Sequence, residues 1–73
     1  MKYNIENNFK YHAPKPWQPE LYTAIRGKAK ELAELIESAC PDSAECVLAL
    51  RKVEESVMWA NAAIARGGET DEN

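Results

Sequence analysis

Two apolar repeats, separated by Pro41, dominate this sequence. In each repeat the apolar side chains recur at alternating spacings of four and three residues, which places them along one face of an α-helix. Two such helices joined by a short turn must lie antiparallel. The repeat positions are Ile25, Ala29, Leu32, Ile36 and Ala39 in the first stretch, and Cys46, Leu50, Val53, Val57, Ala60 and Ile64 in the second. The sequence therefore predicts an all-α fold, an antiparallel two-helix hairpin with an extended N-terminal arm.

Proline, aspartate and glycine mark the ends of the two predicted helices. The first helix is expected to run from Pro19, a residue favoured in a first turn, to about Ala39. The second is expected to begin at Asp42, with Glu45 completing an aspartate version of the capping box, and to stop at Gly67. Three segments follow from these bounds: an N-terminal arm over 1–18, a helical hairpin over 19–66, and an acidic tail over 67–73 that is expected to be disordered.

The chain is short for a protein that must bury a core of its own. It has 73 residues, enough for one domain. In scaffolds of this size, apolar burial and an ordering entropy of about 1.5 kcal/mol per residue nearly cancel. Cys40 and Cys46 could close a local disulfide, but no signal peptide and no membrane-spanning run is present. We therefore expect a cytosolic protein with reduced thiols that is supported by further subunits.

The segment before the first helix combines aromatic rings with positive charge. Residues 9–17 read Phe-Lys-Tyr-His-Ala-Pro-Lys-Pro-Trp, and the two prolines keep this segment out of a helix. Flat rings beside cations suit a flat anionic ligand such as a nucleotide. Residues 1–8 are expected to be mobile or ordered by a partner. The whole chain has a net charge of −3, and its basic arm on an acidic body argues against binding to DNA.

Within the arm, three residues are candidates for ligand contacts. Tyr11 could stack on a base, or it could pack on its own hairpin as most tyrosines do. His12 could donate to a phosphate or a base edge, or be a packed histidine. Asn8 is a candidate polar contact on weaker grounds. Phe9 and Trp17 are expected to pack the arm against the hairpin.

Three basic residues of the first helix are candidates for phosphate contacts. Arg26 and Lys30 lie one turn apart, so Arg26 could grip a phosphate bidentately while Lys30 adds a point charge. The alternative is a solvated face that pairs with Glu31 or Glu34. Lys28 points toward the other flank of the apolar seam.

Three more positions stand out in the helices. Arg66 is either a ligand contact or a charge that complements the end of the second helix. Asn61 falls near the apolar seam, which favours a structural hydrogen bond across subunits. Gly27 costs about 1 kcal/mol against alanine in a helix interior. It suggests a close neighbour on the outer face of the first helix, a subunit or a ligand, or else a tolerated surface glycine.

The sequence contains no arrangement of residues that predicts catalysis. No serine or cysteine stands at a recognisable spacing from His12, the single histidine, and there is no paired carboxylate motif or phosphate-binding glycine loop. His12 also has no companions at metal-ligand spacing. We therefore expect neither an enzyme nor a metal or cofactor.

Three strings and a turn occur in order along the chain. The strings are Phe9-Lys10-Tyr11-His12-Ala13-Pro14, Tyr22-x-x-Ile25-Arg26-x-Lys28-Ala29-Lys30-x-Leu32-Ala33 and Trp59-Ala60-Asn61-Ala62-Ala63-Ile64-Ala65-Arg66, with the turn Cys40-Pro41-x-Ser43-x-Glu45 between the last two. Together, over about residues 8–66, they resemble the small phage anti-CBASS sponge proteins. That family shares its helical hairpin with a group of anti-Thoeris sponges.

The resemblance implies a function and an assembly. Such proteins are non-enzymatic homohexamers that bind cyclic nucleotide second messengers in pockets shared between protomers. Cyclic dinucleotides occupy one pocket type, and some members take cyclic trinucleotides in another. By position in the motifs, Tyr11 corresponds to the tyrosine that stacks on a base, Arg26 to a residue that meets a phosphate, and Arg66 to the arginine that ends the second helix. Lys28 stands where the family has a small hydroxyl residue, which puts that contact in doubt.

Two functions from different classes are therefore predicted. The first is a phage sponge that sequesters cyclic di- or trinucleotides such as cGAMP in the cytoplasm of an infected bacterium, so that CBASS effectors stay inactive. The alternative is a small helical interaction module that docks a helix of a host factor on its apolar flanks. A nucleic-acid-binding arm on a helical dimer is a third and weaker reading.

Overall fold

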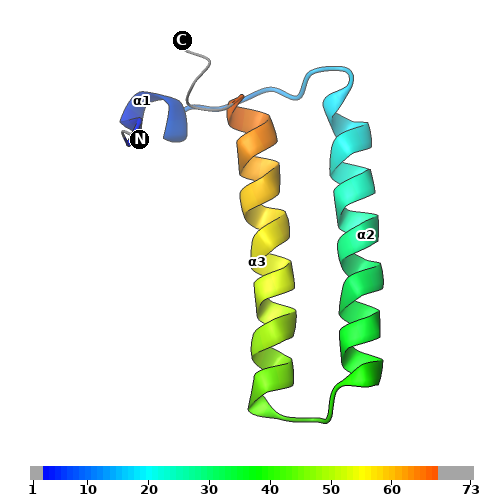
Figure 1. Cartoon of the computed structure of the whole chain (residues 1–73). Coiled ribbons are helices and arrows are strands. Elements are labelled where there is room, and N and C mark those ends of the chain that lie inside the picture. Colours follow the sequence, from blue (N-terminus) through cyan, green and yellow to red (C-terminus); the bar gives the residue numbers. More distant parts are fainter. Residues whose placement is uncertain (1–2, 68–73) are drawn as a thin grey trace.

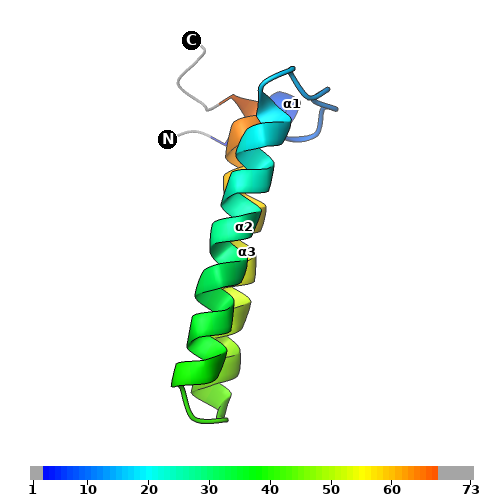
Figure 2. The ribbon, with the colours of Figure 1, turned by 90° about the vertical axis from the view of Figure 1, so that its right-hand side faces the viewer.

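The computed structural model describes residues 3–67 and contains three helices and no strand in that range. The short helix α1 spans Ile5–Asn8, α2 spans Gln18–Ala39 and α3 spans Ala44–Arg66. Figure 1 shows α2 and α3 side by side and antiparallel, with α1 beside the C-terminal end of α3, on the side away from α2. In the view turned by 90° the two long helices overlap, so the hairpin is a single layer of helices (Figure 2). The all-α hairpin predicted from the two repeats is confirmed.

The apolar repeats form the contact between α2 and α3, but they do not form a closed core. No apolar side chain among residues 3–67 is fully buried. Most repeat positions are half-buried, whereas Ala39 is exposed and Leu32 keeps 48% of its surface exposed. Ala33, which lies outside the predicted repeat, is half-buried instead. A pair of helices can cover only one stripe on each helix, so the remaining apolar side chains stay in contact with solvent.

The start of α3 differs from the predicted capping box. Ser43, and not Asp42, is the N-cap: its backbone is extended and its Oγ accepts a hydrogen bond from the Cys46 amide at 3.1 Å. The same hydroxyl donates to the Pro41 carbonyl at 3.0 Å. A carboxylate in its place could only accept a hydrogen bond. The hydroxyl satisfies both the Pro41 carbonyl in the loop and the Cys46 amide in the first turn of the helix. At the other end, Gly67 adopts the left-handed conformation, φ 76°, and its amide donates to the Ala63 carbonyl.

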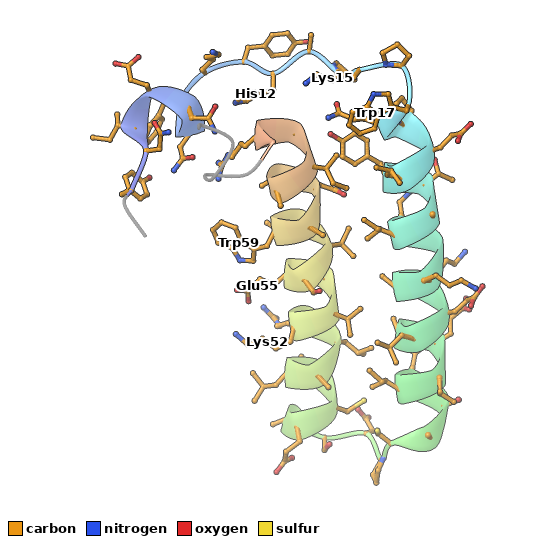
Figure 3. The ribbon with its side chains drawn as sticks, turned by 45° about the horizontal axis from the view of Figure 1, so that its top comes forward. His12, Lys15, Trp17, Lys52, Glu55 and Trp59 are labelled. Atoms are coloured by element: carbon orange, nitrogen blue, oxygen red, sulfur yellow. The ribbon has the colours of Figure 1, made fainter. Side chains whose placement is uncertain are left out.

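The arm is more structured than the sequence suggests. Part of the segment expected to be mobile forms α1, whose N-cap Asn4 accepts from the Asn7 amide at 3.1 Å through its side chain. The arm then crosses the end of α3 to reach α2 (Figures 1 and 3). The predicted disordered tail lies outside the described residues apart from Gly67.

Gln18 ties this crossing segment to both long helices. It is 3% exposed, accepts a hydrogen bond from the Lys15 amide at 2.9 Å and donates to the Ile64 carbonyl at 3.0 Å. The Ile64 carbonyl lies in the last turn of α3, where it has no partner within its own helix. Gln18 is also the first residue of α2, which begins one residue before the predicted Pro19. The side chain of Gln18 therefore connects the arm, the start of α2 and the end of α3.

Replacing Gln18 by leucine is expected to lower the free energy of unfolding by about 1–3 kcal/mol, because it leaves the partly buried Lys15 amide and Ile64 carbonyl without this partner. Thermal or urea unfolding followed by circular dichroism, at one protein concentration, would measure the loss. Glu34→Leu, at an exposed position of the same helix, is the matched control and should change stability by less than about 0.5 kcal/mol. Equal effects of the two variants would contradict the structural role of Gln18.

Candidate functional site

Two shallow grooves run between α2 and α3, one on each side of the hairpin. The first, here the Arg26 groove, has a volume of about 540 Å³. Its lining is Arg26, Ala29, Lys30, Ala33, Leu50, Val53, Glu54, Val57 and Met58. The second, here the Lys28 groove, has a volume of about 370 Å³. Its lining is Ile25, Lys28, Ala29, Leu32, Lys52, Val53, Ser56 and Val57.

The Arg26 groove has the chemistry of an anion site with an apolar floor. Arg26 and Lys30 come from successive turns of α2, and Glu54 is the single acidic residue that lines the groove with them. Within residues 3–67 the ion pairs are Lys28–Glu31 and Lys52–Glu55, so the pairing of Arg26 or Lys30 with Glu31 or Glu34 that the sequence allows is not formed. Both cations are exposed.

Lys28 belongs to the opposite side of the hairpin. It lines the Lys28 groove, and its Nζ lies 3.7 Å from Glu31 Oε1. The structure therefore divides the three basic candidates of α2 between two faces, because positions 26 and 28 are about 200° apart around a helix. Gly27 lies between them, and a methyl group added there would meet nothing within 4 Å among the described residues. Within this chain the outer face of α2 is open at Gly27.

The candidate residues of the arm lie apart from both grooves. Tyr11 is 82% exposed and lines neither groove. His12 is half-buried, and its Nε2 lies 2.8 Å from the Asn7 carbonyl, to which it donates. Asn8 is half-buried at the end of α1. Phe9 and Trp17, which we expected to pack the arm against the hairpin, keep 78% and 56% of their surfaces exposed. This exposure contradicts that expectation within a single chain.

Arg66 lies in the last turn of α3, where the arm crosses. Its carbonyl accepts a hydrogen bond from Asn7 Nδ2 at 3.3 Å, so the backbone of Arg66 helps to hold α1 in place. The side chain is half-buried. Asn61, one turn earlier, has an Oδ1 that is shielded from solvent and has no hydrogen-bond partner among the described residues. The hydrogen bond across subunits that we expect at Asn61 stays a prediction.

Two positioning residues, Gln18 and Asn7, were not predicted from the sequence. Gln18 connects the arm and the end of α3, and Asn7 holds α1 to the carbonyl of Arg66. Neither residue belongs to an apolar repeat or a known motif. The only local signal is that Gln18 precedes Pro19 and so stands where the chain enters a helix.

Lys52, Glu55 and Trp59 form a hydrogen-bonded cluster on the side of α3 that faces away from α2 (Figure 3). Glu55 accepts hydrogen bonds from Lys52 Nζ at 3.2 Å and from the indole Nε1 of Trp59 at 3.2 Å. These two hydrogen bonds lower the pKa of the Glu55 carboxyl. At the turn, Cys40 and Cys46 are both free thiols, and partial burial together with nearby Cys40, Asp42 and Glu37 raises the pKa of the Cys46 thiol.

Among the described residues, none of the helices is both long enough and apolar enough to cross a lipid bilayer. The same residues contain no group of three or more His, Cys, Asp or Glu side chains arranged to hold a metal ion.

Comparison with known proteins identifies the hairpin. The model of a family described as the Acb2/Tad1 hairpin domain matches residues 1–65, which is most of the chain. The searches of curated proteins and of solved structures gave no match. The resemblance to the anti-CBASS and anti-Thoeris sponges is confirmed by the family match. The chain therefore belongs to the Acb2/Tad1 hairpin-domain family of sponge-type phage anti-defence proteins, which act by binding and not as enzymes.

Proposed function

We propose that the protein is a non-enzymatic sponge that binds cyclic dinucleotides and keeps them from the effectors of CBASS immunity in the cytoplasm of an infected bacterium. The observation that carries the proposal is the Arg26 groove, where two cations that form no ion pair within residues 3–67 lie beside an apolar floor. A cyclic dinucleotide presents two phosphates and two bases, which match cations and apolar or aromatic surface. Cyclic trinucleotides are a second proposed ligand class, with Arg66 as a contact.

We infer that the complete pocket is shared between protomers. Tyr11 and Arg26 lie on different parts of one chain, and Tyr11 is almost fully exposed. On a two-fold axis each protomer supplies half of the site, so two Tyr11 rings could enclose the bases while two Arg26 groups neutralise the phosphates. The absence of a fully buried apolar side chain in residues 3–67 also favours a homo-oligomer, and family membership favours a hexamer.

The energies of these contacts together span about 5–12 kcal/mol. Stacking contributes about 1–3 kcal/mol per base, and charge-assisted hydrogen bonds contribute about 1.5–3 kcal/mol each. Two bases and two phosphates in a preformed pocket reach nanomolar affinity, which requires about 12 kcal/mol, only when every contact is near the upper end of its range. His12, Asn8, Lys28 and Lys30 are proposed as secondary contacts.

Isothermal titration calorimetry with a panel of cyclic di- and trinucleotides, cGAMP among them, tests the proposal. At least one cyclic dinucleotide is expected to bind with a stoichiometry of one ligand per two chains. The ligand recovered after heating the complex should be chemically unchanged, which separates sequestration from hydrolysis. No heat for any member of the panel at micromolar protein would contradict the proposed function.

A further inference from the structure

The side of α3 that faces away from α2 carries a narrow stripe of four exposed residues, here the outer stripe: Leu48, Lys52, Glu55 and Trp59. At 100° per residue these positions fall within about 60° of one another. Leu48 is 57% exposed and Trp59 63% exposed. None of the four lines the Arg26 groove, whereas Lys52 also borders the Lys28 groove on the other side of the hairpin.

The two ends of the outer stripe are apolar, and its centre is an ion pair. Lys52 Nζ lies 3.2 Å from Glu55 Oε1, and the other oxygen of Glu55 accepts from the Trp59 indole at 3.2 Å. This hydrogen bond satisfies the single polar atom of the Trp59 side chain and restricts the ring to one orientation. What Trp59 offers to a neighbour is therefore an apolar ring held in place on the outer side of α3 (Figure 3).

The outer stripe is self-complementary when read in the opposite direction. Leu48 lies four residues before Lys52, and Trp59 lies four residues after Glu55, so both pairs are centred on the same point of the helix. If a second copy of α3 is laid antiparallel across that point, Lys52 lies opposite Glu55 of the partner subunit. Leu48 then lies opposite the partner subunit's Trp59. Reciprocity of this kind is the requirement for a contact on a two-fold axis.

The position of α1 agrees with an antiparallel partner. Figure 1 shows α1 on the side of α3 away from α2, next to the C-terminal end of α3. Its exposed apolar side chains include Ile5 at 64%, with Phe9 at 78% directly after the helix. The turn end of an antiparallel partner would reach this corner, so α1 could cover the part of the partner that α3 does not.

We propose that the outer stripe is a two-fold contact between copies of this chain, in which Leu48 of each copy packs on Trp59 of the other and the two Lys52–Glu55 cross pairs set the register. The order of the charges along the stripe favours a second copy of the chain as the partner, because the stripe is complementary to itself in the antiparallel direction. The apolar ends supply the attraction, and the charged centre opposes shifted or parallel pairing. The contact goes beyond the proposed function, because it assigns the residues of one interface between protomers, and none of them lines the Arg26 groove.

Charge-reversal variants of the full chain test the contact. Lys52→Glu places two glutamates against two glutamates across the axis, and Glu55→Lys places lysines against lysines. Each variant alone is expected to self-associate about tenfold more weakly than the parent chain in sedimentation velocity over a concentration series. An equimolar mixture of the two restores both opposite-charge cross pairs, and its association should return to within about threefold of the parent.

The matched control is Glu31→Lys, which disrupts the Lys28–Glu31 pair of the same spacing on α2. It should leave association unchanged, and mixing it with Lys52→Glu should rescue nothing. A variant whose helix content falls when alone but recovers on mixing also supports the contact, because only a cross-chain pair responds to mixing.

The proposal is overturned if Lys52→Glu and Glu55→Lys associate like the parent, or if their mixture stays as weak as each variant alone. Calorimetry on the parent chain decides ligand binding independently of this result. Failure of the mixing experiment would therefore leave the sponge proposal in place, and absence of ligand heat would leave the two-fold contact in place.

Discussion

Replacement of Tyr11 by alanine is expected to weaken cyclic dinucleotide binding by at least about thirtyfold, because the loss of one stacking ring per base removes about 1 kcal/mol or more from each of two bases. Tyr11 is 82% exposed and makes no side-chain hydrogen bond within the described residues, so its removal should leave the fold intact. Calorimetry with the tightest ligand of the panel would measure the change, and circular dichroism would verify the helix content.

Two variants make the test of Tyr11 specific. Tyr11→Phe keeps the ring and should retain affinity within about threefold, since stacking depends on the aromatic face and not on the hydroxyl. Phe9→Ala removes an exposed ring two residues away and should have a much smaller effect than Tyr11→Ala. Equal affinity of Tyr11→Ala and the parent chain would show that the arm supplies no stacking surface, and would favour the alternative of a protein-interaction module.

Replacement of Arg26 by alanine is expected to weaken the same ligand by about a hundredfold, since a charge-assisted hydrogen bond to each of two phosphates is lost at about 1.5 kcal/mol or more each. Arg26 has no ion-pair partner among the described residues, so little folding stability depends on it. Competition titration at two salt concentrations would measure the loss and its electrostatic origin, because binding by the parent should weaken more steeply with added salt than binding by the variant, which keeps Lys30.

Arg51→Ala is the matched control for Arg26, because it removes the same charge from an exposed position of α3 that lines neither groove. It should leave affinity within about twofold, as expected for a distant, screened charge. The variant Lys28→Ala then tests which of the two grooves holds the phosphates. A small effect would place the phosphates in the Arg26 groove, whereas a loss as large as that of Arg26→Ala would contradict a site built on that groove alone.

The helices could be predicted because their signals are local. The alternating repeats, Pro41 and Gly67 determine where α2 and α3 lie to within about two residues, since each signal acts through the backbone of its own segment. The N-cap was one residue off because Ser43 can accept from the helix and donate to the turn at once, which depends on the path of the turn. Helix α1 was missed because its support, the hydrogen bond from Asn7 to the Arg66 carbonyl, spans almost the whole chain.

In the candidate site, too, the features with local signals were predictable and those that depend on distant segments were not. Residue types alone identified Tyr11, Arg26 and Lys30 as groups suited to a nucleotide, and helical periodicity placed Arg26 and Lys30 on one face. Periodicity also separated Lys28 from them, as the structure confirms. The connection that Gln18 makes between the arm and the end of α3 was not predictable, because a glutamine reveals its burial only when the segments on both sides of it are in place.

The sequence by itself determined the helical hairpin, the antiparallel direction of its helices and the family to which the chain belongs, because these follow from short-range periodicity, turn chemistry and the order of motifs. Only the tertiary structure decided which surfaces remain open. It placed Tyr11 apart from Arg26, left the seam without a fully buried side chain and left Leu48, Lys52, Glu55 and Trp59 of α3 exposed. The physical reason is that the periodicity of a helix specifies a face, whereas the contact of that face with α2, the arm or solvent depends on segments distant in the chain.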